Sequence, residues 1–173
     1  MTVMDNAQAK FLMEQLTGLW ESEFAMTCKV LEAVPDDKRD YKPDPKSRSA
    51  WDLTTHLATA DIWFLDSIIN AQFNWDPEAA KAAAAGFKTV AEVVAFYKRE
   101  FPARLATLRG MPADQLARQA DFFGLIKGPA AQFLGLANNH SVHHRGQLAT
   151  HLRAMGSKVP PIYGDSADHP MGS

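Results

Sequence analysis

Histidine is the residue type in this sequence whose spacing could support metal chemistry. Four of the six histidines lie between His140 and His151. His140 and His144 are four residues apart, so on a helix both rings leave the same face and can share one metal ion. His143 points in another direction, and His151 lies two turns beyond His144, about 10 Å along the helix axis, too far to bind the same ion.

A third histidine, His56, lies on a separate segment beside the apolar residues Leu53 and Leu57. Buried imidazoles need polar partners, and one metal ion can satisfy three of them together. Three protein ligands with a position left open are typical of catalytic zinc sites. The alternative is that each ring only forms hydrogen bonds within the core. We favour a metal site with His56, His140 and His144 as its ligands.

Four further residues could support these ligands. Asp52 lies four residues before His56 and could accept its second ring proton, or it could only cap the helix; the two interpretations are equally good. His143 belongs either to this outer layer or to the surface. Gln147 and Arg145 follow the ligands on the same segment. Arg145 either contacts an anionic substrate or is a solvated surface residue, and we favour the second interpretation.

Other catalytic motifs are missing from the sequence. Ser141 follows His140, so the histidine pair is not part of a His-Glu-x-x-His motif with its general base. There is no Cys-x-x-Cys pair, no phosphate-binding glycine loop and no Gly-x-Ser-x-Gly elbow. Cys28 is the single cysteine, which excludes an intrachain disulfide, and its place in an apolar stripe indicates a core residue.

Four long segments with the helical period of apolar residues must position the histidines. We expect these helices at residues 6–34, from Ser49 onward, from Thr89 onward, and at residues 130–155, with connections at residues 74–88 and 110–129. Pro102 should kink or break the third helix. Four amphipathic helices can bury their stripes against one another. The sequence therefore predicts an all-α protein, a four-helix bundle forming a single domain over residues 1–173.

Composition narrows the possible partners. The net charge is −2, so no overall basic field attracts nucleic acid or anionic lipid. No apolar run approaches the length of a membrane span, and the N-terminus does not resemble a signal peptide. We expect a cytoplasmic protein with no nucleic-acid or membrane partner. A second apolar row on the first helix predicts a homodimer; the alternative is that it widens the face buried within the subunit. The row consists of Leu12, Leu19, Met26 and Val30.

Three segments together resemble the DinB/YfiT-like family of metal-binding four-helix bundles. They are the proline-containing loop at residues 41–49, the Leu-Thr-Thr-His-Leu stretch at residues 53–57, and the His-Ser-Val-His-His-Arg-Gly-Gln-Leu stretch at residues 140–148. The resemblance implies an up-down-down-up bundle, often dimeric, with zinc or nickel bound by His56, His140 and His144. Relatives often have an acidic residue at the position of Ser141, so this chain departs from the pattern there.

The resemblance also implies an activity, because characterised relatives include thiol-dependent S-transferases and a thiol-dependent maleylpyruvate isomerase. The leading hypothesis is a metal-dependent transferase that activates a low-molecular-weight thiol toward an electrophilic substrate. The second is a non-catalytic metal-binding module of a stress response. The third is a scaffold in which the histidines only stabilise the fold. The sequence names neither the thiol nor the electrophile.

Overall fold

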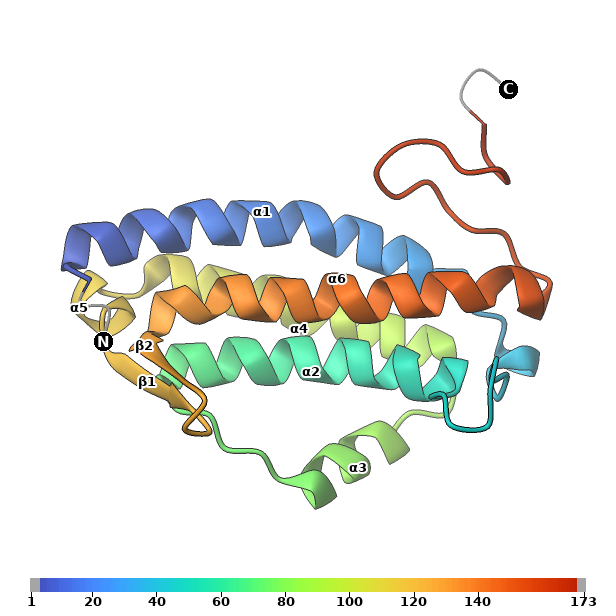
Figure 1. The fold of residues 1–173 in the computed structure, drawn as a ribbon, viewed down its shortest axis with the longest axis horizontal. Helices are drawn as coiled ribbons and strands as arrows, with labels where there is room; N and C mark the ends of the chain where they lie inside the picture. The colour runs from blue at the N-terminus through green and yellow to red at the C-terminus, as the bar shows by residue number, and fades with distance from the viewer. Residues whose placement is uncertain (1–3, 171–173) are drawn as a thin grey trace.

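Four long helices form the body of the molecule, which the computed structural model describes from residue 4 to residue 170. They are α1 (Asn6–Glu32), α2 (Ala50–Asn70), α4 (Val90–Gly110) and α6 (Phe133–Leu152). Helices α1 and α6 run in one direction, and α2 and α4 run in the other (Figure 1). Because α1 and α2 each pack against both α4 and α6, they lie diagonally across the bundle. The predicted all-α, up-down-down-up bundle is confirmed.

Helices α1, α2 and α4 each begin where a side chain satisfies a free amide group, whereas α6 has no side-chain cap. Ser49 caps α2 by accepting from the Asp52 amide at 3.0 Å, and Asp52 Oδ2 accepts from the Ser49 amide at 3.1 Å. Thr89 caps α4 by accepting from the Glu92 amide at 3.2 Å, while the Glu92 carboxylate accepts from the Lys88 amide. The predicted starts at Ser49 and Thr89 are therefore confirmed as cap positions. Helix α4 continues through Pro102, so the proline does not break it.

Aromatic side chains fill much of the core between the helices. Trp20 of α1 meets Phe101 of α4 edge to face at 5.2 Å between ring centroids, and Phe24 stacks on Phe101 at 4.9 Å. Cys28 is buried in the same cluster, as predicted. Aromatic rings of this size contribute much of the apolar area that holds such a bundle together.

Both connections contain regular structure that the sequence did not predict. The first holds α3 (Pro77–Ala85), which begins with Asp76 as its cap and Pro77 in its first turn. None of its residues is buried, so it carries no apolar stripe to reveal it. The second connection holds α5 (Ala113–Leu116) and an antiparallel hairpin of β1 (Gln119–Phe122) and β2 (Ile126–Pro129). Strands of four residues are too short to show a clear alternation.

The chain after α6 folds back toward α1. A 3₁₀ turn (Arg153–Met155) and Gly156, with φ of 80°, end the helix. Ser157 then donates a hydrogen bond to the Ala33 carbonyl oxygen, and the following segment lies above the C-terminal half of α1 (Figure 1). Within residues 4–170, no helix combines the length and the apolar character that crossing a bilayer requires.

Candidate metal centre

The three predicted ligands come together midway along the bundle. His56 extends from α2, and His140 and His144 extend from adjacent turns of α6. One ring nitrogen of each lies within 4.8 Å of the others. The His56 and His140 Nε2 atoms are 3.3 Å apart. Two imidazole nitrogens on a tetrahedral zinc ion, each at about 2.0–2.1 Å, would be separated by roughly the same distance. The triad can therefore hold a metal ion.

The environment keeps these rings neutral at neutral pH. Burial, with a smaller contribution from Arg48, lowers the pKa of His56 to about 3. Burial and the neighbouring His144 lower the pKa of His140 to about 4, and burial also lowers the pKa of His144. A neutral imidazole has a free lone pair on one nitrogen, which is the form that binds metal. The low pKa values mean that the three ring nitrogens bind a proton weakly, and their lone pairs remain free to bind a metal ion.

Gln147 orients one of the ligands. Its side-chain oxygen accepts a hydrogen bond from His144 Nδ1 at 2.8 Å. This bond places the ring proton on Nδ1 and leaves the Nε2 lone pair free to face the other two histidines. The prediction that Gln147 supports the ligands is consistent with this contact.

The other predicted supporting residues take different positions. Asp52 bonds to the Ser49 amide, and within residues 4–170 it makes no hydrogen bond to His56, so its role is that of a cap. His143 is exposed on α6, with its ring 5.0 Å from that of His144. His151 is buried against Tyr41, at 5.6 Å between ring centroids, away from the triad.

Arg145 is a correction to the sequence analysis, because it is neither solvated nor available to a substrate. Its side chain is 2% exposed and forms an ion pair with Glu23 of α1 at 2.6 Å. It also donates to the Glu23 carbonyl oxygen and to the Tyr163 hydroxyl. One residue after His144, the helix has turned by about 100°, so Arg145 faces α1 instead of the triad. The signal that could have revealed it was a glutamate on the inward face of α1, between Trp20 and Thr27.

A second buried polar group lies beside the ligand helix and was also missed. Asp61 of α2 is fully buried, and its Oδ2 atom accepts from the Tyr97 hydroxyl at 2.7 Å and from the Ser141 hydroxyl at 2.8 Å. Burial raises the pKa of Asp61 to about 7. Ser141, which follows His140, thus ties α6 to α2 and α4. The signal was an aspartate in the middle of the apolar face of α2.

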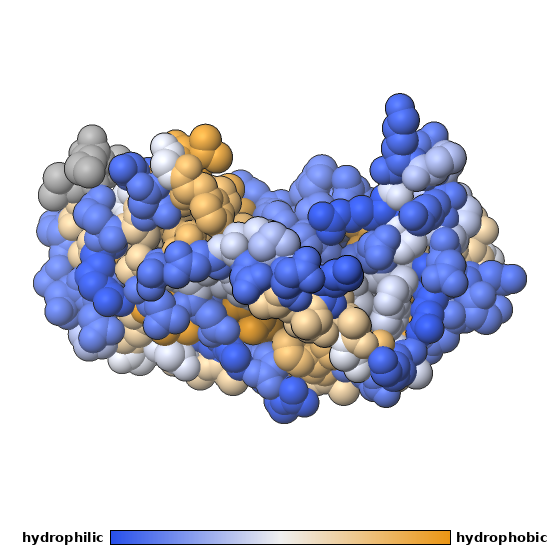
Figure 2. Space-filling model, turned by 90° about the horizontal axis from the view of Figure 1, so that it is seen from below, coloured by the Kyte–Doolittle hydropathy of each residue, from blue (hydrophilic) through white to orange (hydrophobic). Residues whose placement is uncertain are grey.

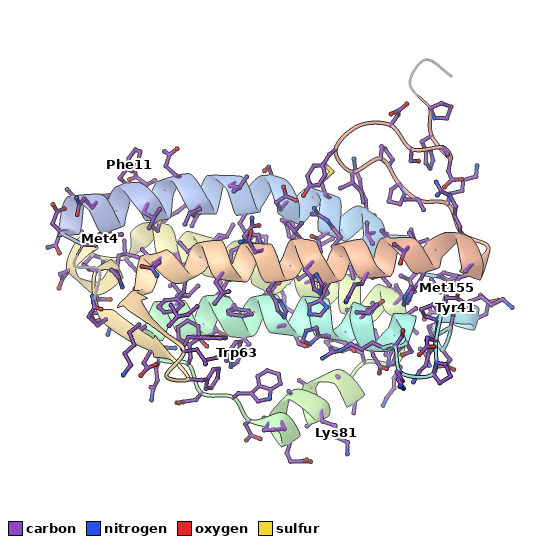
Figure 3. All side chains as sticks on the ribbon, viewed as in Figure 1. Met4, Phe11, Tyr41, Trp63, Lys81 and Met155 are labelled. Atoms are coloured by element: carbon purple, nitrogen blue, oxygen red, sulfur yellow. The ribbon has the colours of Figure 1, made fainter. Side chains whose placement is uncertain are left out.

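Two cavities flank the triad, and Arg48 lines both. The first, of about 330 Å³, is lined by His144, Gln147, Thr150 and His151 of α6 and by Leu53, Lys46, Ser47 and Arg48. The second, of about 390 Å³, lies between α2 and α3; its lining includes Arg48, Asp52, His56, Trp75 and Lys81. Lys81 of α3 and Trp63 of α2 mark this side of the molecule in Figure 3. Small molecules can therefore approach the ligands from two directions.

Known proteins share the sequence pattern and the helical fold described above. A sequence model of the DinB family matches residues 4–171. The Bacillus subtilis protein YjoA is 28% identical over 151 residues, covering 86% of this chain and 94% of YjoA. Its crystal structure, described as a DinB-like protein, superposes with a TM-score of 0.67 over 86% of this chain and 96% of that chain.

Two further structures share the fold. A DinB-like protein from Bacillus cereus has a TM-score of 0.69 at 23% identity, covering 87% of this chain and 97% of that chain. A mycothiol-dependent maleylpyruvate isomerase has a TM-score of 0.50 at 13% identity, covering 91% of this chain and 64% of that chain. At such identities the likeness is one of fold alone.

Proposed function

The chain belongs to the DinB family, and from this premise we propose that it binds one divalent metal ion, zinc or nickel, and uses the site as a thiol-dependent transferase. The ligands are His56, His140 and His144. The thiol is a small, soluble one, and the second substrate is an electrophile.

The observation that carries the proposal is the convergence of three neutral imidazole nitrogens in a group that, among residues 4–170, includes no carboxylate. Three neutral ligands leave the charge of a divalent ion uncompensated, so the site favours an anionic fourth ligand. A bound ion of this kind lowers the pKa of a coordinating thiol and so supplies a thiolate nucleophile near neutral pH. The chain then needs no strong base of its own; Asp52, which lines the cavity beside His56, accepts a hydrogen bond from the Ser49 amide.

The protein's own residues supply position and access. Gln147 holds the His144 ring so that its Nε2 atom faces the site. The two cavities beside His144 and His56 leave room for two molecules on different sides of the triad. Thiol dependence in the maleylpyruvate isomerase of similar fold supports the choice of thiol chemistry as a proposal for this chain.

Metal analysis followed by thiol titration tests the proposal. Purified protein should contain about one equivalent of zinc or nickel. Replacement by cobalt should give a sulfur-to-metal charge-transfer band when a thiol is added, with release of the thiol proton. Turnover of a thiol with a generic electrophile then separates a transferase from a metal-binding module without catalysis. A cobalt spectrum unaffected by any thiol would contradict the transferase and favour the non-catalytic alternative.

A further inference from the structure

Unpaired positive charge gathers around the triad although the chain as a whole is slightly acidic. The net charge is −2, yet the two flanking cavities are lined by Lys46, Arg48 and Lys81. Asp52 is the acidic residue among their described lining residues, and one of its oxygens is already bonded to the Ser49 amide. Viewed from the α3 side, much of this face is hydrophilic (Figure 2).

Arg48 is the central member of this group. It lines both cavities, the one beside His144 and the one beside His56. Within residues 4–170 its guanidinium forms no ion pair and no hydrogen bond, in contrast to Arg104 and Arg109, which pair with carboxylates. Arg48 is exposed to solvent, so water screens its repulsion of a bound divalent cation, and an anion placed between the two would be attracted by both.

The backbone that carries Arg48 is held in place. Ser49, the next residue, is the cap of α2. The Ala50 amide donates to the Tyr41 carbonyl oxygen at 3.0 Å, and the Ser47 amide donates to the Asp44 carbonyl oxygen at 2.9 Å. The backbone from which the Arg48 side chain extends is therefore fixed next to both cavities.

We propose that Arg48, with Lys46, binds a carboxylate on the substrate thiol in the 330 Å³ cavity beside His144, while the thiol group reaches the metal site. This cavity has two cations and no acidic residue among its described lining residues, whereas the other balances Arg48 and Lys81 with Asp52. Guanidinium and carboxylate form paired, charge-assisted hydrogen bonds. Anion recognition, the less favoured of the two interpretations that the sequence offered for Arg145, is assigned in this proposal to Arg48. This inference rests on the proposed thiol-binding site.

Matched thiols on the cobalt-substituted protein test the inference. The probes are 3-mercaptopropionate and 6-mercaptohexanoate, each compared with its own neutral amide, and the readout is the thiol concentration that half-saturates the charge-transfer band. The wild type should bind at least one acid about tenfold or more tightly than its amide, the scale of a charge-assisted hydrogen bond. Arg48→Gln should reduce this ratio to near one and leave binding of the amide unchanged.

Variants of four cationic residues show which side chain produces the preference for the acid over its amide. Arg48→Lys should keep part of the ratio, and Lys46→Gln should lower it. Lys81→Gln, in the other cavity, and Lys42→Gln, exposed in the same loop but outside both cavities, should leave the ratio as in the wild type. Equal cobalt content and equal melting temperatures verify that each variant is folded and loaded.

The possible results distinguish the carboxylate site from the proposed binding of a thiol at the metal. A charge-transfer band with equal affinity for acids and amides overturns the carboxylate site and leaves thiol binding standing. A ratio that Lys81→Gln lowers and Lys46→Gln does not overturns the choice of cavity. No band with any thiol overturns the proposed thiol binding and, with it, this inference.

Discussion

The guanidinium of Arg145 lies 2.6 Å from the carboxylate of Glu23 inside the bundle. The Tyr163 hydroxyl donates to the same carboxylate at 2.7 Å, so the pair joins α6, α1 and the C-terminal segment. Removing one member of a buried ion pair leaves the other charged and without its partner.

Arg145→Ala should therefore lower the free energy of unfolding by ~3–5 kcal/mol. Urea denaturation measures this change. The control is Arg109→Ala, which breaks an exposed pair with Glu21 and should cost no more than ~1 kcal/mol. A loss for Arg145→Ala as small as that of the control would show that the buried pair adds nothing to stability.

The metal content should depend on three histidines and not on their neighbours. His56→Ala, His140→Ala and His144→Ala should each reduce bound metal sharply, because each removes one of three ligands. His143→Ala and His151→Ala should retain it, since their rings lie outside the triad. Elemental analysis of the purified variants provides the measurement. Loss of metal from His151→Ala with retention in His56→Ala would refute the assignment of the third ligand.

Gln147→Leu should weaken metal binding without abolishing it. The substitution removes the acceptor that holds the His144 ring, a kind of change that typically costs 10–100-fold in metal affinity. Competition with a chelator of known affinity measures it. Thr150→Val is the matched control, because Thr150 lines the same cavity and its hydroxyl bonds to the Gln147 main chain and not to the side chain that holds His144. Equal affinities for Gln147→Leu and the wild type would show that the bond does not orient the ring.

Because of Asp61, the free energy of unfolding should fall as the pH rises from about 4 to about 7. Burial raises its pKa from 3.8 to about 7, so across this range the native state holds a proton that the unfolded chain has lost. Stability then falls by at most ~1.4 kcal/mol per pH unit and levels off above the higher pKa.

Asp61→Asn should remove this part of the pH dependence, because the amide has no proton to lose. Urea denaturation at several pH values compares it with the wild type and with Asp114→Asn, which alters an exposed carboxyl. An unchanged slope in Asp61→Asn would mean that another group produces the dependence.

We propose that two chains pair through α1. In the predicted apolar row, Val30 is fully buried inside the subunit and is not available, but Leu19 is 48% exposed and the nearby Phe11 is 63% exposed. Light scattering should report a dimer that Leu19→Glu converts to a monomer, while Leu125→Glu, on the exposed hairpin turn, leaves it intact. A monomeric wild type would end this proposal.

Local pattern was sufficient for the helices and for part of the site. The caps at Ser49 and Thr89 and the helical period of apolar residues depend on neighbours within one or two turns, so the sequence alone predicts them. The shared face of His140 and His144 follows from the same geometry. His56 was placed with them because a polar ring beside an apolar stripe needs a partner.

The tertiary structure decided what depends on contacts between helices. Arg145 looks like a surface residue along its own helix and becomes buried only because α1 presents Glu23 to it. Arg48 lies 92 residues before His140 in the chain, and it lines a cavity together with His144 of α6 only because α2 packs beside α6. Helix α3 and the hairpin carry too few buried residues to leave a periodic signal. Periodicity shows which face of a helix is buried; which residues meet across that face is set by the packing of the whole bundle.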